Sequence, residues 1–271
     1  MKNMFSLSGK TIVVTGGTGV LGESFNKAIQ DAGANVVIIG RNKEKAEQRA
    51  HEIIQNGGNA IGLSVDVTKI EVLEFAKKTI LDKYGAIDGL VNGAGGNMPG
   101  AVVQPGGDIF DLDIQSLKEV MDLNLFGTIL PTQVFAKEML NSNKGSIVNI
   151  SSVSAHKALT RVLGYSLAKT AIESYTKWFA IESAKRYGDK LRFNTIVPGF
   201  FLTEQNRTLL TNEDGTLTSR GQDINKQTPF SRFGQPEELT GALVWLLSDA
   251  SAFVNGSSII IDGGFLSYSG V

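Results

Sequence analysis

The chain has no cysteine, which excludes disulfide bonds and thiol catalysis. Its two histidines, His51 and His156, lie far apart without ligand spacing, which argues against a catalytic zinc site. No run of 18 apolar residues occurs, and residues 1–10 lack an apolar signal core. The formal net charge of −1 provides no electrostatic attraction for nucleic acid or an anionic membrane. These absences predict a cytoplasmic protein without a metal, nucleic-acid or membrane partner.

The length and the hydrophobic pattern predict one α/β domain over residues 1–271. Short apolar runs alternate with amphipathic stretches, and no repeat or low-complexity linker divides the chain. This alternation is typical of a doubly wound Rossmann fold, here a seven-stranded parallel sheet with helices on both faces. The predicted strands are 11–15, 35–40, 60–65, 87–91, 146–150, 192–197 and 258–261, and the clearest helices are 21–32, 43–55, 72–84 and 236–247.

Two predicted loops, near 93–113 and 198–227, are too long to be simple connections. Both follow the carboxyl ends of strands, where open α/β sheets bind their ligands. We therefore expect these loops to surround the substrate.

A glycine-rich turn follows the first predicted strand and opens the first helix, in the sequence Thr15-Gly-Gly-Thr-Gly-Val-Leu-Gly22. Glycines permit a tight turn and a close approach of the backbone, and a helix N-terminus favours the negative charge of a pyrophosphate. The turn therefore predicts dinucleotide binding. The residues expected to contact the cofactor are Gly16, Thr18, Gly19, Val20 and Leu21.

The adenosine end of this site lacks the acidic residue that usually binds the ribose of NAD. The second strand ends instead at Arg41 and Asn42. A guanidinium can pair with a 2′-phosphate, which favours NADP, although Arg41 stacked on adenine is compatible with NAD. Asp66, followed by Val67, either accepts from the adenine amino group or caps the next helix.

Tyr165 and Lys169 are four residues apart, a spacing that places both on one face of a helix. An ammonium near a phenol predicts a pKa for Tyr165 below its usual value of about 10. Such a tyrosine can exchange a proton with a carbonyl or alcohol oxygen. Ser152, at the end of a predicted strand, is expected to hydrogen-bond the same oxygen.

These motifs, in this order and spacing, resemble the short-chain dehydrogenase/reductase family over nearly the whole chain. Val20 departs from the family's usual turn, which has glycine at that position. The resemblance implies that Tyr165 is the general acid/base, Ser152 orients the substrate, and Lys169 supports Tyr165 and the nicotinamide ribose. It further implies that Asn124 anchors a proton-relay water, and that Asn92, Gly93, Ala94, Gly95, Pro198, Gly199 and Thr203 line the cofactor site.

Four stretches narrow the resemblance within this family: 92–97, 130–137, 198–207 and 262–271. They resemble those of the bacterial D-mannonate oxidoreductases, which interconvert D-mannonate and D-fructuronate. A hexuronate needs a cation for its carboxylate and hydrogen-bond partners for its hydroxyls. Alternatives are a gluconate 5-dehydrogenase-like enzyme, a 3-oxoacyl reductase, or a nucleotide-sensing protein without catalysis. The residues predicted to contact the substrate are Asn97, Ser152, His156, Arg161, Gln205, Asn206 and Arg207.

The two helices that carry Asn124 and Tyr165 have more apolar residues than one core face requires. The family commonly pairs subunits through these helices, so the resemblance implies a homotetramer. The apolar residues in question are Phe126, Ile129, Val134, Phe135, Ile172, Trp178, Phe179 and Ile181.

Overall fold

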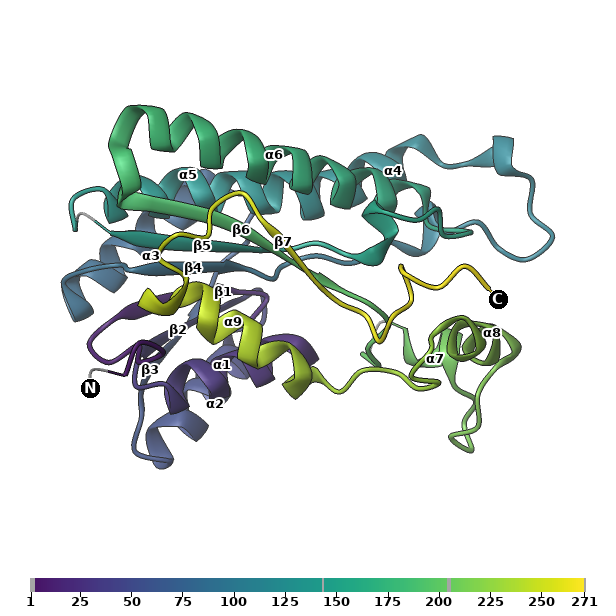
Figure 1. Ribbon diagram of the computed structural model, residues 1–271, viewed down its shortest axis with the longest axis horizontal. Helices are drawn as coiled ribbons and strands as arrows, with labels where there is room; N and C mark the ends of the chain where they lie inside the picture. The colour runs from purple at the N-terminus through teal and green to yellow at the C-terminus, as the bar shows by residue number, and fades with distance from the viewer. Residues whose placement is uncertain (1–2, 143, 204–205, 271) are drawn as a thin grey trace.

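The computed structural model describes residues 3–142, 144–203 and 206–270. Seven parallel strands form one sheet in the order β3-β2-β1-β4-β5-β6-β7 (Figure 1). All seven predicted strands are present, and no end is shifted by more than two residues. The strands are β1 (Thr11–Thr15), β2 (Asn35–Gly40), β3 (Asn59–Ser64), β4 (Gly89–Asn92), β5 (Gly145–Ile150), β6 (Leu191–Pro198) and β7 (Ser258–Ile261).

Helices cover both faces of the sheet, as the alternating pattern predicted (Figure 1). In β1, Ile12 and Val14 pack against one helical layer, whereas Val13 packs against the other. All three are fully buried, which explains why the strand reads as a continuous apolar run. One layer contains α1 (Val20–Asp31), α2 (Lys43–Gln55) and α9 (Thr240–Leu247); the other contains α3 (Ile70–Tyr84), α4 (Ile114–Met121), α5 (Gly127–Met139) and α6 (Leu163–Tyr187).

Glycines end the first three helices, as expected. Gly33, Gly57 and Gly85 all have positive φ angles, a conformation that glycine adopts without a steric penalty. The predicted helix over 236–247 begins instead as a 3-10 turn, Pro236–Leu239, before α9. Among the described residues, no helix is both long and apolar enough to cross a membrane.

The order in which strands are added to the sheet reverses between β1 and β4. In open α/β sheets a crevice for a ligand forms at such a point. Both long segments emerge at the carboxyl edge beside this crevice. The first contains two 3-10 turns, Pro99–Ala101 and Ile109–Asp111. The second was predicted to be a loop but contains α7 (Arg207–Leu210) and α8 (Ser219–Gln227). Short polar helices of this kind lack the long apolar periodicity on which the prediction depended.

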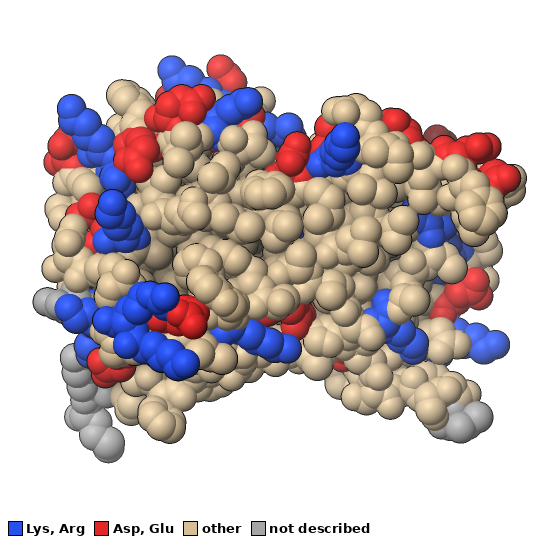
Figure 2. Space-filling model, turned by 90° about the horizontal axis from the view of Figure 1, so that it is seen from above, with Lys and Arg blue, Asp and Glu red and all other residues tan. Residues whose placement is uncertain are grey.

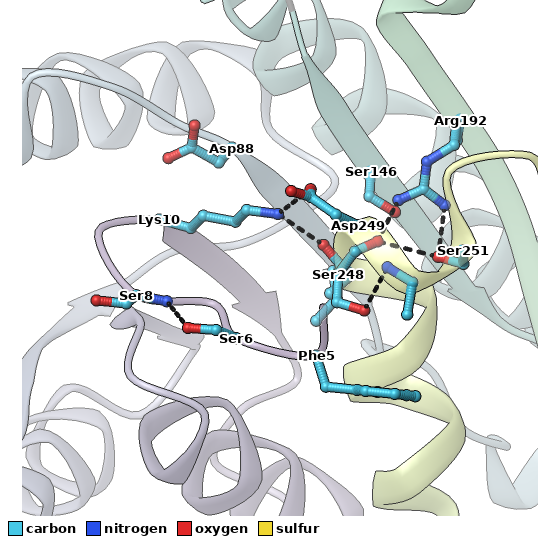
Figure 3. Close-up of polar contacts among 12 residues, drawn as sticks. Phe5, Ser6, Ser8, Lys10, Asp88, Ser146, Arg192, Ser248, Asp249 and Ser251 are labelled. Carbon is cyan, nitrogen blue, oxygen red and sulfur yellow. Dashed lines mark hydrogen bonds and ion pairs between the residues drawn. The ribbon is translucent and has the colours of Figure 1, made fainter. Parts of the chain in front are cut away.

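The opposite edge of the sheet is closed by polar contacts (Figure 3). Lys10, just before β1, donates to Asp249 Oδ1 at 3.0 Å. Arg192, in β6, donates to Ser251 Oγ at 2.9 Å and to the Ser248 carbonyl at 3.1 Å. These bonds tie the amino ends of the strands to the chain after α9, which leaves the carboxyl edge for a ligand.

Candidate active site

Ser152 and Tyr165 meet at the carboxyl edge of the sheet. Ser152 lies two residues beyond β5 and begins a 3-10 turn, in which its hydroxyl accepts from Ser154 N at 3.2 Å. Tyr165 lies in the first turn of α6, half-buried, and its phenol is hydrogen-bonded by the Ser152 hydroxyl. The structure thus brings together the two residues that the sequence placed thirteen positions apart.

Lys169 is one helical turn further along α6, with its side chain buried below Tyr165. Its Nζ donates to the Ile150 carbonyl at 2.8 Å and lies 5.3 Å from the centre of the Tyr165 ring. Lys169 is only 4% exposed, and this burial lowers the pKa of its ammonium from 10.5 to about 8. The ammonium is therefore close to the phenol, as the four-residue spacing predicted.

The prediction of a lowered phenol pKa was wrong for the protein alone. Burial raises the pKa of Tyr165 above 10, and the hydrogen bond from Ser152 opposes this rise only in part. Desolvation disfavours the phenolate, and no pattern in the sequence measures how far the tyrosine is removed from water. Tyr165 is consequently a neutral phenol at neutral pH, the form that can donate a proton.

Asn124 is fully buried in a π-helical turn, Asp122–Phe126, between α4 and α5. Its Nδ2 donates to the carbonyls of Gly96 at 2.7 Å and Val120 at 2.8 Å, and its Oδ1 accepts from Gly96 N at 3.1 Å. A Cβ on Gly95 would lie 2.6 Å from Asn124 Oδ1 and 3.3 Å from Lys169 Nζ. Only glycine at position 95 lets the loop after β4 pass between these two side chains.

Glu173 supports the segment that follows Ser152, and the sequence reasoning missed it. It follows Tyr165 and Lys169 on α6 with the same spacing of four residues, which was the signal available. Its buried carboxylate lies 2.8 Å from His156 Nε2 and accepts from Ser258 Oγ at 2.8 Å. The carboxylate therefore joins the segment after Ser152, α6 and β7. The side chain of His156, a predicted substrate residue, therefore contacts this carboxylate.

The glycine turn after β1 packs directly against the loop after β4. Gly16 has a φ of 67°, and a Cβ there would lie 2.6 Å from the Gly93 carbonyl. The hydroxyl of Thr15 accepts from Gly93 N and Ala94 N, both at 3.2 Å. Glycine at position 16 is thus required for these two loops to touch, at the point where the sheet reverses.

The amino end of α1 fits a pyrophosphate. Gly19 is its N-cap residue and supplies no side-chain hydrogen bond, so the first N–H groups of the helix have no side-chain cap. Val20 and Leu21 form the first turn. Gly40 leaves room for Thr18, because a Cβ on Gly40 would lie 2.6 Å from the Thr18 side chain. These residues form a cradle of backbone donors that a phosphate can approach.

The adenosine end combines an exposed cation with a carboxylate. Arg41 is exposed after β2 and lies within electrostatic reach of Asp66, which follows β3. Asp66 Oδ1 accepts from the N and Oγ1 of Thr68, so this oxygen caps the local turn. Asn42 caps α2 by accepting from Lys45 N at 2.7 Å, and Val67 is buried. Arg41 and Asp66 are thus the two charged side chains that follow β2 and β3 at this end of the sheet.

Asn92 has a structural arrangement that the family resemblance did not imply. Its Nδ2 donates to Thr132 Oγ1 at 2.9 Å and Asn149 Oδ1 at 2.8 Å. Asn149 in turn donates to Thr176 Oγ1 at 2.8 Å. This buried chain of polar groups ties β4 and β5 to α5 and α6, and thereby fixes the helix of Tyr165 to the sheet.

The segment after β6 folds against the end of β7. A Cβ on Gly199 would lie 2.7 Å from Asp262 Cα, so the chain at Gly199 passes so close to Asp262 that only glycine fits there. The Asn206 amide donates to the Phe201 carbonyl and accepts from Thr203 N, both at 2.8 Å. Asn206 therefore shapes this turn with both ends of its amide. Gln205 lies outside the described residues.

The remaining predicted substrate residues lie in or beside the long segments. Asn97 and Arg207 are exposed. Arg161 donates from Nε to the Val103 carbonyl at 2.9 Å and from Nη2 to Gln104 Oε1 at 3.1 Å. Arg161 thus holds the 93–113 segment beside the amino end of α6. Among the described residues, no group of three histidines, cysteines or carboxylates is arranged to bind a metal.

Comparison with known proteins identifies the family. The profile described as enoyl-(acyl carrier protein) reductase matches residues 19–266. The uncharacterized oxidoreductase UxuB of Bacillus subtilis is 43% identical over 275 residues, which cover 98% of each chain. The chain belongs to the short-chain dehydrogenase/reductase family. It is accordingly an NAD(P)-dependent oxidoreductase, and its seven-stranded fold is the one that the resemblance implied.

Two solved structures of short-chain dehydrogenases resemble this chain over nearly its full length. A Haemophilus influenzae protein provisionally described as a D-mannonate oxidoreductase, with bound NAD, is 40% identical, with a TM-score of 0.93 and 98% of each chain covered. A gluconate 5-dehydrogenase from Burkholderia cenocepacia, in complex with NADP and tartrate, is 32% identical, with a TM-score of 0.86 and coverage of 97% and 98%. These relatives bind different cofactors, so they leave the preference for NAD or NADP open.

Proposed function

We propose that this protein reduces the ketone of D-fructuronate to D-mannonate, and catalyses the reverse oxidation. The observation that carries the proposal is the complete set of Asn124, Ser152, Tyr165 and Lys169 at the carboxyl edge of the sheet, with Tyr165 bonded to Ser152 and Lys169 below it. The 40% identity with the Haemophilus influenzae protein supports the choice of substrate.

Each member of this set has a role that follows from its environment. The Ser152 hydroxyl bonds the phenol and is placed to bond the substrate oxygen as well. Tyr165 donates its proton to that oxygen during reduction, since burial keeps the phenol neutral at neutral pH. Lys169, charged below about pH 8, stabilises the phenolate that remains. Asn124 fixes the loop after β4 beside Lys169.

The cofactor would be held by the backbone of the glycine turn and by the ends of β2, β3, β4 and β6. Bound there, the nicotinamide supplies or accepts the hydride of the reaction. The residues proposed to hold it are those predicted from the sequence: Gly16, Thr18, Gly19, Val20, Leu21, Arg41, Asn42, Asp66, Val67, Asn92, Gly93, Ala94, Gly95, Tyr165, Lys169, Pro198, Gly199 and Thr203. Exposed Arg41 favours NADP, because it offers a fork of donors to a 2′-phosphate.

The second long segment, which was predicted to surround the substrate, suits a polar molecule better than an oily one. The segment from Asn206 to Gln227 is rich in Asn, Gln, Thr and Arg. A sugar acid needs many hydrogen-bond partners, whereas an acyl chain would need an apolar wall. The gluconate 5-dehydrogenase relative favours a second candidate substrate, 5-ketogluconate, which the same site chemistry could reduce.

The proposal is tested by initial rates of nicotinamide oxidation with D-fructuronate, D-tagaturonate and 5-ketogluconate, each with NADH and NADPH. We expect rapid turnover with D-fructuronate. Selective turnover of 5-ketogluconate would mean that this acid is the substrate and that the proposed mechanism still applies. Tyr165→Phe should lose nearly all turnover while retaining cofactor binding. A Tyr165→Phe variant as active as the wild type, or a wild type inactive on all three acids, would reject the proposal.

We further propose that two copies of the chain pair through α5 and α6, as part of a homotetramer. Of the apolar residues singled out on these helices, Val134, Phe135 and Ile172 face the core, whereas Phe126, Trp178 and Ile181 are 46%, 58% and 58% exposed. Figure 2 views this side of the molecule, where charged residues gather toward the rim and leave the middle largely uncharged. A second copy with the same apolar face would cover it symmetrically.

A further inference from the structure

Two arginines from distant parts of the chain come together beside the amino end of α6. Arg220, on α8, donates from Nη1 to Thr160 Oγ1 at 3.1 Å and from Nη2 to the Thr160 carbonyl at 3.5 Å. Arg161 is the next residue in the chain. Burial, together with the positive charge of Arg161, lowers the pKa of Arg220. The Arg220 guanidinium therefore lies against Thr160, the residue next to Arg161, and the positive charge of Arg161 disfavours the charge of Arg220.

Arg161 is held in place by contacts that fix both its backbone and its side chain. Its φ is 78°, a strained conformation for a residue with a long side chain. Its carbonyl accepts from Val103 N at 3.0 Å, and its Nε and Nη2 are occupied by Val103 and Gln104. No hydrogen bond from Nη1 is found within the described part of the chain. The guanidinium is thus preorganised with one nitrogen still able to donate.

Neither arginine is paired with a carboxylate among the residues that the structure describes. Arg49, Arg186 and Arg232 all form ion pairs with glutamates, whereas Arg161 and Arg220 use neutral oxygens as acceptors. Two adjacent cations without a counter-charge are unfavourable, and an anion between them would relieve their repulsion. The planar donor forks of arginine suit a carboxylate in particular.

The position of the pair suits one end of a six-carbon acid whose ketone lies at Tyr165. Arg161 lies four residues before Tyr165 and just outside α6, so four extended residues limit the separation of the two backbones to about 14 Å. In D-fructuronate the ketone carbon and the carboxylate carbon are separated by four bonds, about 5 Å when extended, given carbon–carbon bonds of ~1.5 Å. With the added reach of the two side chains, an acid of this length can contact both residues.

We propose that Arg161 and Arg220 together bind the carboxylate of the substrate and so select sugar acids over neutral sugars. This inference rests on the proposed function, because it assigns the group that recognises the acid. It also gives α8 a role: a bound carboxylate would join α8, the 156–162 segment and the 93–113 segment over the reacting carbon. Arg220 was not among the substrate residues predicted from the sequence.

A purely structural role for Arg220, as an anchor of α8 on Thr160, makes different predictions. Thr160→Val removes the 3.1 Å anchoring bond and leaves both guanidinium groups in place. Arg220→Gln removes the charge. If Arg220 binds the carboxylate, only Arg220→Gln should weaken substrate binding; if it is an anchor, both variants should behave alike.

We would measure kcat and KM for D-fructuronate in the wild type, Arg220→Gln, Arg220→Lys and Thr160→Val, with KM for the cofactor as the readout of an intact site. Loss of one charged hydrogen-bond partner should raise KM for the acid about tenfold to a hundredfold with kcat little changed. Arg220→Lys should recover part of this loss, and Thr160→Val should resemble the wild type. An unchanged KM in Arg220→Gln, or an equal rise in Thr160→Val, would overturn the inference.

A binding measurement separates this inference from the choice of substrate. Calorimetric titration of D-mannonate and D-gluconate into protein saturated with cofactor requires no turnover. At least tenfold weaker binding of either acid by Arg220→Gln supports the carboxylate site, even if D-fructuronate is not reduced. If the wild type reduces D-fructuronate but Arg220→Gln binds both acids as tightly, the function stands and the carboxylate site does not. Absence of binding of both acids to the wild type would also refute the site.

Discussion

Replacing Asn124 with alanine tests how the loop after β4 is held beside Lys169. The Asn124 amide makes three buried hydrogen bonds, two to Gly96 and one to the Val120 carbonyl. Alanine would remove all three and leave two carbonyls and one N–H without their partners. Because Asn124, Val120 and Gly96 are all buried, water cannot replace these bonds without local opening.

The expected cost is large relative to the stability of a typical domain. Each buried polar group left unsatisfied costs about 1–3 kcal/mol, so the three together should lower the free energy of unfolding by about 3–9 kcal/mol. A total stability of about 5–15 kcal/mol is usual, so this variant should be strongly destabilised. Asn141→Ala is the matched control, because the Asn141 amide is exposed and donates to the Glu138 carboxylate, and it should cost less than about 0.5 kcal/mol.

Urea unfolding followed by circular dichroism would measure this difference at fixed protein concentration. Hydrogen exchange at the Gly96 amide provides a local check, since Asn124 Oδ1 is its acceptor. The amide should be protected in the wild type and exchange rapidly in Asn124→Ala. A cost below about 1 kcal/mol, with the Gly96 amide still protected, would refute the assignment of Asn124 as the residue that holds this loop.

Three further predictions concern charge and assembly. The unfolded chain binds a proton at Lys169 up to its ordinary pKa of 10.5, whereas the folded chain releases it at about 8. Between pH 8 and pH 10.5 the free energy of unfolding of the wild type should therefore rise by about 3 kcal/mol more than that of Lys169→Met. If the urea midpoints of the two proteins change equally with pH, this prediction is wrong. Arg41→Asp should raise KM for NADPH about tenfold or more and leave KM for NADH similar or lower. The reason is that a carboxylate repels a 2′-phosphate but accepts a hydrogen bond from a ribose hydroxyl. If the ratio of the two KM values does not change, Arg41 does not bind the 2′-phosphate. Charges introduced by Trp178→Glu with Ile181→Lys should reduce the mass measured by light scattering, and an unaltered mass would move the interface elsewhere.

The main elements of the site were predictable because they depend on local spacing. Tyr165 and Lys169 share a helix face because they are four residues apart. Ser152 comes directly after a short segment with Ile147, Val148 and Ile150, which predicted a buried strand. The glycine turn was equally readable, because Gly16 and its neighbours must pass close to other backbone. The same rule would have identified Glu173, one further interval along α6.

The sequence could not reveal the features that depend on contacts between distant segments, and the predicted pKa shift of Tyr165 was wrong for that reason. The pKa of Tyr165 rises because of burial, which no local pattern measures. Asn206 shapes its own turn, and Arg161 bonds Val103 and Gln104, residues far away in the sequence. Arg220 belongs to α8, a helix in a segment that the hydrophobic pattern predicted to be a loop.

By itself, the sequence determined the parallel sheet, its two helical layers and the meeting of Ser152, Tyr165 and Lys169, because hydrophobic period and residue spacing fix how each element presents its side chains. The tertiary structure alone decided which polar groups are withdrawn from water and which charges become neighbours. Burial shifts the pKa of Tyr165 upward and that of Lys169 downward, and the fold sets Arg220 beside Arg161. Desolvation and long-range charge contacts arise only once the segments have packed together, so they are properties of the folded chain.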